Sequence, residues 1–347
     1  MDLKKLINAI KGKTFGHLMG GFKNKIGKTI GNNDAIKRIL ICRPDHRLGN
    51  LLLLSPLVQE LESTFPKSEI DLLVNQSCAM QLYQNYDNVK QVIEFPQKPF
   101  KHPIQYIRTF VRLRSRKYDL AINAVNESSH GRIFTAISNA KFKLVGDRDT
   151  DKKEKHIAKQ VIYSLREFLP NIGLKANDAI PASLDLRLAN DELIHGGNLV
   201  YNIVQNAQPT ICLFTHVTGT ECYTERWWLN LYERLQKAFP EVNIIEILPK
   251  ENFSKIGFRT PALYSNDIRE LAAMIANTDV FIGADSGVMH LASSSLTTTI
   301  GLFSVSDTER YKPYNEGSVA VKTNEVEIDE LIGLVKNALY PNLNTSA

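Results

Sequence analysis

Short apolar runs alternate with longer amphipathic stretches along most of the chain. A run of about five apolar residues predicts a buried strand, and apolar residues at three- and four-residue steps predict a helix. In the first half, the predicted strands are residues 38–42, 70–74, 89–95 and 120–124. The predicted helices are residues 51–65, with a bend caused by Pro56, and residues 98–117 and 131–138.

The same alternation restarts after a break near residues 171–186, which is rich in Pro, Asn, Gly and Asp. The later predicted strands are residues 210–215, 243–248, 280–282 and 299–303. The later predicted helices are residues 190–205, 227–239, 267–277, 288–295 and 328–339. Ser265 or Asn266 is the expected N-cap of the helix at 267–277.

Strands that alternate with helices predict an α/β protein with parallel, doubly wound sheets. The break then separates two Rossmann-like domains, one over residues 35–185 and one over residues 186–347, with the last helix able to pack back on the first domain. We expect the two domains to face each other across a cleft that binds the ligand.

Residues 1–34 precede this pattern as a basic leader. Within residues 1–30, seven lysines face a single acid, Asp2, and apolar residues recur between them at helical spacing. A basic amphipathic helix of this kind binds an anionic membrane surface. The alternatives are a cationic leader without fixed structure and a helix that packs on the rest of the protein.

Composition excludes several classes of protein. The 347 residues are 43% hydrophobic and 23% charged, with a net charge of +5, which is typical of a globular protein with room for two cores. The four cysteines are scattered without CxxC spacing and indicate neither a disulfide framework nor a zinc site. No apolar run is long enough for a transmembrane helix, and residues 1–30 lack the features of a secretory signal.

A strand–turn–helix–strand unit over residues 279–303 carries the first candidate site. Asp285, Ser286 and Gly287 form a turn of small residues before the helix that begins at Val288. The first N–H groups of a helix are unpaired and lie at the positive end of its dipole, so this turn predicts an anion site. The alternative is one more ordinary strand–turn–helix unit of an α/β protein.

The sequence from Gly283 to Asn315 resembles the donor-site signature of glycosyltransferase family 9, the ADP-heptose:lipopolysaccharide heptosyltransferases. That signature combines a D-[ST]-G-x-x-H-[LI]-A run with a later turn containing Asp and a Pro-Tyr pair. The matching residues are Asp285, Ser286, Gly287, His290, Leu291, Ala292, Asp307, Pro313 and Tyr314.

The loop after the first strand resembles the N-terminal signature of the same family, in which an Asp follows a Gly and acts as the catalytic base. Here Gly49 is followed by Asn50, and an amide does not accept a proton at neutral pH. Asp45 and His46, earlier on the loop, are the candidate bases, with Asp45 preferred. The alternative for Asp45 is a turn or cap residue. The resemblance places Gly49 and Asn50 at the donor.

Other donor and acceptor residues follow from weaker parts of the resemblance. For the donor they are Thr215, Thr218, Arg226 and Lys250, together with Asp285, Ser286, Gly287, Val288 and His290. Arg226 is expected to hold phosphate, while Glu225 stands where the family often has lysine. Trp227 and Trp228 are expected to pack in the core. For the acceptor the candidates are Arg112, Ser128 and Arg132, at the end of a strongly cationic stretch.

Asp147, Asp149 and Asp151 alternate like a metal-binding loop, but Lys152 and Ala158 replace the Gly and Glu that a calcium loop requires. We interpret this segment as a solvated turn and expect no metal and no cofactor.

The resemblance implies a GT-B fold and inverting, metal-independent transfer from a nucleotide diphosphate sugar, such as ADP-heptose, to an anionic glycolipid of the lipopolysaccharide type. We expect a cytoplasmic monomer with peripheral contact to the inner membrane surface and no nucleic-acid partner. The alternatives are a nucleotide-sugar-binding module that has lost transfer, as Asn50 suggests, and a nucleotide-sugar epimerase or hydrolase on the same fold.

Overall fold

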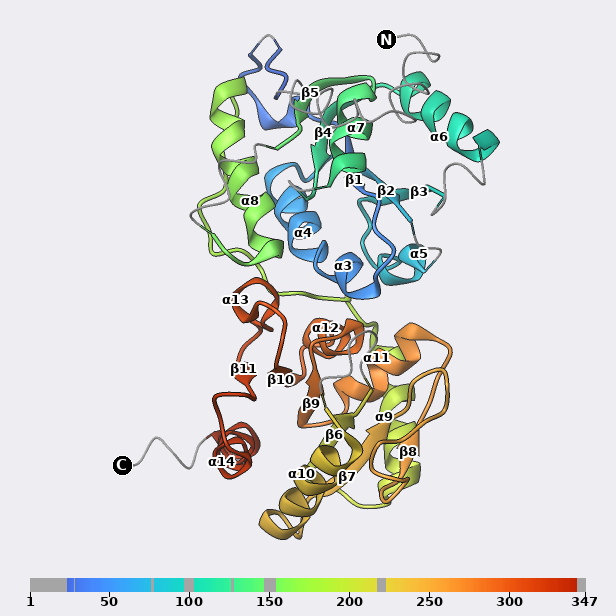
Figure 1. Ribbon diagram of the computed structural model, residues 1–347. Coiled ribbons are helices and arrows are strands. Elements are labelled where there is room, and N and C mark those ends of the chain that lie inside the picture. The colour runs from blue at the N-terminus through green and yellow to red at the C-terminus, as the bar shows by residue number, and fades with distance from the viewer. Residues whose placement is uncertain are drawn as a thin grey trace. The chain divides into compact units, whose positions relative to one another are not determined.

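A computed structural model describes residues 24–27, 29–75, 78–96, 103–125, 128–146, 154–216 and 223–341. The chain divides into two compact units (Figure 1). Unit 1 comprises Met1–His46, Pro56–Met80 and Tyr86–Ala182, and unit 2 comprises Arg47–Ser55, Gln81–Asn85 and Ser183–Ala347. Two short segments from the first half of the sequence therefore belong to unit 2.

Unit 1 is built on a five-stranded parallel sheet in the order β3-β2-β1-β4-β5. Its strands are β1 (Arg38–Arg43), β2 (Glu69–Val74), β3 (Val89–Glu94), β4 (Tyr118–Asn123) and β5 (Ala140–Leu144). Its helices are η1 (Asn33–Ala35), α4 (Ser55–Thr64), α5 (Ala79–Leu82), α6 (Pro103–Ser115), α7 (Ser129–Ile137), α8 (Ile157–Phe168) and η2 (Leu169–Ile172). The strand order reverses between β1 and β4, so the carboxyl ends of these strands form the switch point at which such sheets bind ligands.

Unit 2 is built on a six-stranded parallel sheet in the order β11-β10-β9-β6-β7-β8. Its strands are β6 (Thr210–Phe214), β7 (Asn243–Ile247), β8 (Ala262–Leu263), β9 (Val280–Ala284), β10 (Thr298–Phe303) and β11 (Val319–Lys322). Its helices are α3 (Leu48–Leu52), α9 (Asn190–Val204), α10 (Glu225–Ala238), α11 (Ile268–Ala276), α12 (Gly287–Ser294), α13 (Thr308–Tyr311) and α14 (Ile328–Leu339). Here the order reverses between β6 and β9, as in a dinucleotide-binding sheet.

Helices cover both faces of the sheet of unit 2 (Figure 1), and strands covered on both faces are mostly apolar. Every residue of β6 and β9 is buried. Trp228 of α10 is fully buried in the same core and Trp227 packs against it, which confirms the prediction that these side chains serve packing. The prediction of parallel, doubly wound sheets is confirmed in both units.

The predicted single helix over residues 51–65 is wrong, because the structure has two helices, α3 and α4. Pro56 lies in the first turn of α4, where its missing N–H costs nothing, but its ring excludes a helical bond to the Leu52 carbonyl. The hydroxyl of Ser55 donates to that carbonyl instead, at 2.9 Å. The bend predicted at Pro56 is thus a complete helix break.

The predicted N-cap of α11 is also wrong, since Asp267 caps this helix and accepts hydrogen bonds from the N–H groups of Arg269 and Glu270. The hydroxyl of Ser265 accepts from the N–H of Asp267 at 3.0 Å and donates to Glu270 at 2.7 Å. Ser265 therefore supports the cap from two residues earlier.

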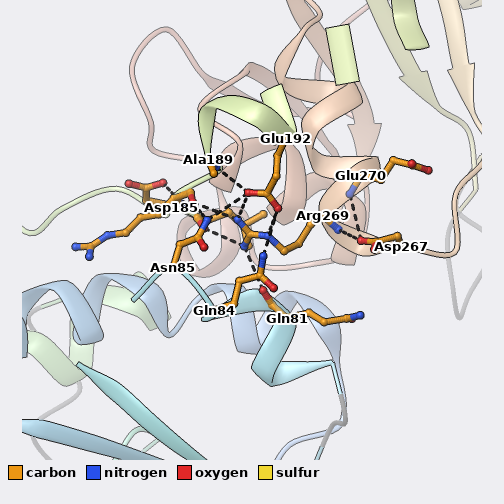
Figure 2. A network of polar contacts seen from close by, with 11 residues as sticks. Gln81, Gln84, Asn85, Asp185, Ala189, Glu192, Asp267, Arg269 and Glu270 are labelled. Carbon is orange, nitrogen blue, oxygen red and sulfur yellow. Dashed lines mark hydrogen bonds and ion pairs between the residues drawn. The ribbon is translucent and has the colours of Figure 1, made fainter. Parts of the chain in front are cut away.

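The buried side chain of Arg269 holds several segments of unit 2 together (Figure 2). Its guanidinium makes a bidentate pair with Glu192 of α9, at 2.6 and 2.7 Å. Its remaining N–H groups donate to the backbone carbonyls of Gln81, Leu186 and Arg187 at 3.1–3.2 Å. All five donors of the guanidinium are used, so α9, α11 and the 81–85 segment form one rigid body within unit 2.

Part of the predicted leader is bonded to unit 1. Lys25 forms a backbone bridge with Lys143 of β5, and the N–H of Ile30 donates to Ile172 at 3.0 Å. Residues 1–23 and residue 28, on which the proposed membrane-binding helix depends, lie outside the described residues. Among the helices that the structure describes, none combines the length and the apolar character needed to cross a bilayer.

Candidate functional site

The switch point of unit 2 brings together two loops that the sequence analysis singled out. Thr215 follows β6, and Asp285 follows the neighbouring strand β9. Ligands of open α/β sheets bind at the carboxyl ends of the strands beside such a reversal of strand order. The Asp285–Gly287 turn therefore occupies the position at which this topology forms its site.

The turn into α12 presents backbone donors. Ser286 is the N-cap of this helix, with its hydroxyl accepting from the N–H of Met289 at 3.3 Å. The next two N–H groups, those of Gly287 and Val288, bond to none of the described residues. Two donors without a partner among the described residues, at the positive end of an eight-residue helix, are the groups that an anion site requires.

Helix α3 packs directly against this turn and brings Gly49 to it. A Cβ atom on Gly49 would stand only 2.6 Å from Cδ2 of His290 and 3.5 Å from Cα of Gly287. A Cβ atom on Gly287 would stand 3.2 Å from that of Leu48. The absence of side chains at both glycines lets α3 and α12 meet at the Asp285–Gly287 turn, which is called the donor turn below.

Asp285 is half-buried at the centre of this arrangement. Burial raises the pKa of its carboxyl, while a hydrogen bond from the Ser306 side chain and the charge of Arg47 act in the opposite direction. Its Oδ1 lies 3.8 Å from Nε2 of His290, whose side chain is buried. A carboxylate held in this way is suited to orienting the turn and His290 and poorly suited to contacting a phosphate, because two anions repel.

Glu246 is a buried acid that the sequence analysis did not select. It lies in β7, next to β6, and is fully buried. The hydroxyls of Thr215 and Ser254 donate to its two carboxylate oxygens, at 2.6 and 2.5 Å. Burial raises the pKa of Glu246, and these two bonds lower it in part. The signal in the sequence was a single acid inside the apolar run from Ile244 to Leu248.

The other predicted donor residues are dispersed over unit 2. The hydroxyl of Thr215 is buried between Glu246 and the backbone N–H of Lys255, which donates to it at 3.3 Å. Arg226 lies exposed in the first turn of α10, and Lys250 lies exposed after β7. Thr218 lies outside the described residues.

A cavity of about 260 Å³ opens beside the donor turn, at the carboxyl ends of β10 and β11. Its wall includes Ser304 and Ser306, and Ser306 is the residue that bonds to Asp285. The hydroxyl of Ser304 is buried without a partner among the described residues. This cavity therefore offers polar groups next to the anion site.

The candidate base and acceptor residues lie in unit 1, at its own switch point. Asp45 and His46 follow β1, with the N–H of Asp45 turned back to the Arg43 carbonyl at 2.8 Å. Ser128, after β4, caps α7 by accepting from the N–H of Gly131 at 3.1 Å. Arg132 is buried and donates to the Gly146 carbonyl at 2.9 Å.

Arg112, by contrast, is exposed on α6. The structure thus brings Gly49, Asp285, Ser286, Gly287, Val288 and His290 together, and gives Ser128 and Arg132 structural partners of their own. Asp147, Asp149 and Asp151 lie outside the described residues, and within those residues no three His, Cys, Asp or Glu side chains gather as a metal site would require.

Comparison with known sequences supports the resemblance to this family. Residues 265–331, which contain α11, the donor turn and α12, match the sequence model of glycosyltransferase family 9 (heptosyltransferase). The chain is a glycosyltransferase that is similar to this family over the matched residues. This enzyme is 22% identical over 302 residues to lipopolysaccharide heptosyltransferase 3 of Escherichia coli, covering 78% of this chain and 85% of that protein.

Solved structures agree on the fold of this glycosyltransferase. A family 9 enzyme from Veillonella parvula has a TM-score of 0.70 at 15% identity, covering 88% of this chain and 98% of that one. The E. coli heptosyltransferase WaaC with ADP has a TM-score of 0.64 at 14% identity, covering 87% of this chain and 99% of that one. The GT-B-type α/β fold is therefore confirmed, with two parallel-sheet units.

Proposed function

We propose that this glycosyltransferase moves a heptose or a related sugar from a nucleotide diphosphate sugar to an anionic, lipid-linked saccharide of the lipopolysaccharide type. Two of the relatives named above are heptosyltransferases, and one of these was solved with ADP. The observation that carries the proposal is the pair of unpaired N–H groups on Gly287 and Val288, at the switch point of unit 2.

The donor diphosphate binds at this turn in our proposal. Its oxygens accept from Gly287 and Val288, and its negative charge is stabilised by the dipole of α12. Arg226 offsets the charge that develops on the diphosphate as it leaves, without a metal ion. Asp285 and His290 hold the turn, and the cavity beside Ser306 accommodates part of the donor.

The transfer step inverts the anomeric configuration. An oxygen of an acceptor hydroxyl attacks the anomeric carbon from the side opposite the diphosphate. The bond between that carbon and the diphosphate oxygen breaks, and the nucleoside diphosphate leaves with the electron pair. Asp45 accepts the proton of the hydroxyl, since Asn50 cannot. Arg112, Ser128 and Arg132 are the proposed acceptor contacts, and His46 is the alternative base.

Binding and turnover are tested separately. Calorimetric titration with a panel of nucleotide sugars, ADP-heptose included, measures the donor site, and incubation with lipid-linked saccharide followed by mass spectrometry measures transfer. We expect the donor to bind and the acceptor to gain the mass of one sugar. Failure to bind any nucleotide diphosphate sugar would refute the proposal.

The base is tested by two reciprocal variants. Asp45→Asn should lower the transfer rate by about 10²- to 10⁴-fold, the usual contribution of a general base, with donor affinity unchanged. Asn50→Asp in the same background should restore part of the rate, because it returns a carboxylate to the position at which the family signature has its base. Near-normal transfer by Asp45→Asn alone would exclude Asp45.

One observation favours a second function. Asn50 removes the carboxylate from the position at which the family places its base, so a donor-binding module that has lost transfer is the alternative. Two results together would support the binding module. The chain would bind the donor without transferring sugar to any saccharide tested, and Asn50→Asp would gain transfer.

The proposed enzyme works as a monomer at the inner membrane surface, because a lipid-linked acceptor is presented there. Its +5 net charge is compatible with anionic lipids. Sedimentation of the purified chain with and without acceptor-bearing vesicles tests both statements.

A further inference from the structure

Helix α6 of unit 1 exposes an unusual combination of side chains. Its inner face is formed by Tyr106, Thr109 and Leu113, which are buried against the core of unit 1. On the opposite face Ile104 and Val111 are 66% and 55% exposed. These two residues are seven positions apart and therefore lie on one stripe of the helix, two turns from each other.

The charges of α6 surround this apolar stripe. Arg108 lies on the stripe between Ile104 and Val111, and Arg112 and Arg114 lie on its two sides. All three arginines are exposed, and α6 contains no acid. Arg116, just beyond the helix, is instead paired with buried Asp71 at 3.1 Å and belongs to the structure of unit 1.

An apolar stripe flanked by arginines fits one kind of surface. A protein partner would need both an apolar patch and acids spaced to match, whereas an anionic bilayer provides both without a defined shape. The apolar side chains enter the boundary between head groups and acyl chains, and the arginines remain among the phosphates. The charge complementarity of an acid-free helix with an anionic leaflet therefore favours lipid.

We propose that the face of α6 formed by Ile104, Arg108 and Val111 docks unit 1 on an anionic phospholipid bilayer. This docking deepens the proposed function, which places the acceptor in a membrane, and it assigns the contact to a helix that lies outside the basic leader. It is separate from the acceptor contact proposed for Arg112, because the docking face is formed by Ile104, Arg108 and Val111 and depends on its exposed apolar side chains.

The test is vesicle flotation of the full chain, without nucleotide sugar or acceptor. The vesicles contain phosphatidylcholine alone or with about 30 mol% phosphatidylglycerol. The double variant Ile104→Ser/Val111→Ser should lower partitioning onto the anionic vesicles by about tenfold or more, since buried apolar area drives such binding. Arg108→Gln should lower it by about fivefold at low salt and by less at high salt, where charges are screened.

Helix α9 provides matched controls. Ile194 and Tyr201 of α9 are 57% and 58% exposed. They have the same sequence spacing as Ile104 and Val111 of α6. Unlike α6, however, α9 begins with two acids, Asp191 and Glu192. Ile194→Ser/Tyr201→Ser should bind vesicles like the wild type. Circular dichroism should show all variants folded, because exposed positions rarely change stability by more than about 0.5 kcal/mol.

Three results would overturn the proposal. Unchanged vesicle binding by the α6 variants would assign the membrane contact to another part of the chain. An equal loss in the α9 variants would show that the effect is not specific. Loss of transfer to a delipidated saccharide by Arg108→Gln, with vesicle binding intact, would make α6 an acceptor site. Because the flotation assay contains no donor, its outcome is independent of whether the chain transfers a sugar.

Discussion

The contact between α3 and α12 gives the sharpest test of the donor site. Gly49→Ala adds one methyl group, which would stand 2.6 Å from the His290 ring. A carbon–carbon contact needs about 3.5–4.0 Å, so α3, α12 or the His290 ring must move by about 1 Å. Each of these moves displaces a group that holds the donor turn.

The expected magnitude combines two opposing effects. Overpacking of a buried contact costs about 1–3 kcal/mol. Alanine is a better helix former than glycine by about 0.5–1 kcal/mol, and residue 49 lies within α3. We therefore expect Gly49→Ala to destabilise unit 2 by about 0.5–2 kcal/mol.

Gly333→Ala is the matched control, because it lies in α14 and a Cβ atom there meets nothing within 4 Å. It should stabilise unit 2 by about 0.5–1 kcal/mol. The difference between the two variants isolates the contact with His290, since the gain in helix propensity is common to both.

Urea unfolding followed by tryptophan fluorescence is the appropriate assay. The chain has two tryptophans, Trp227 and Trp228, and both lie in α10 of unit 2, so the signal reports the unit that contains the contact. Titration of the same variants with donor should show weaker binding for Gly49→Ala and unchanged binding for Gly333→Ala. Equal stability and equal donor affinity of the two variants would refute the proposed role of the α3–α12 contact.

Three further predictions follow from single residues. Arg269→Leu leaves Glu192 without its cation and should lower the free energy of unfolding in urea by about 2–4 kcal/mol. This loss is below that for a fully buried pair, because Glu192 keeps some solvent contact. Arg234→Ala, at an exposed pair, should lower it by under about 1 kcal/mol. Burial raises the pKa of the Glu246 carboxyl above its ordinary value of 4.5, so the folded state holds that proton more tightly than the unfolded chain does. The free energy of unfolding therefore falls as the pH rises from about 4.5 through the folded pKa. Glu246→Gln should flatten the resulting decline in melting temperature between about pH 4 and 7. Ser286→Asp keeps a capping oxygen for α12 and should retain stability within about 0.5 kcal/mol, yet weaken donor binding, because its charge repels the diphosphate.

Each of these has a contrary outcome. Equal losses for the Arg269 and Arg234 variants would mean that the buried network is not what holds α9 to α11. Parallel melting curves for wild type and Glu246→Gln across the pH range would remove the assigned cause. Undiminished donor affinity in Ser286→Asp would place the diphosphate away from the turn.

The sequence predicted the fold well where its pattern was strong. The apolar runs and the helix starts placed both parallel sheets, and the Asp285–Gly287 turn proved to lie at the switch point of unit 2. Strands β5 and β11 and helix α8 were not predicted. The two strands lie at sheet edges, where exposed residues interrupt the buried ones, so neither gives the continuous apolar run that marks the central strands.

Tertiary contacts explain what the sequence did not reveal. Gly49 matched a motif, but only the structure shows that its missing side chain makes room for His290. Arg269 appeared as one more charge on an amphipathic helix, and its partners come from segments up to 188 residues away. Glu246 was hidden because its partners, Thr215 and Ser254, lie on two other loops.

The central claim is that backbone N–H groups at the start of α12 hold the diphosphate of a nucleotide sugar. A crystal structure of this chain with a nucleoside diphosphate tests it most directly. We predict phosphate oxygens within about 3 Å of the backbone nitrogens of Gly287 and Val288. A nucleoside diphosphate bound elsewhere, with both N–H groups left to water, would contradict the account.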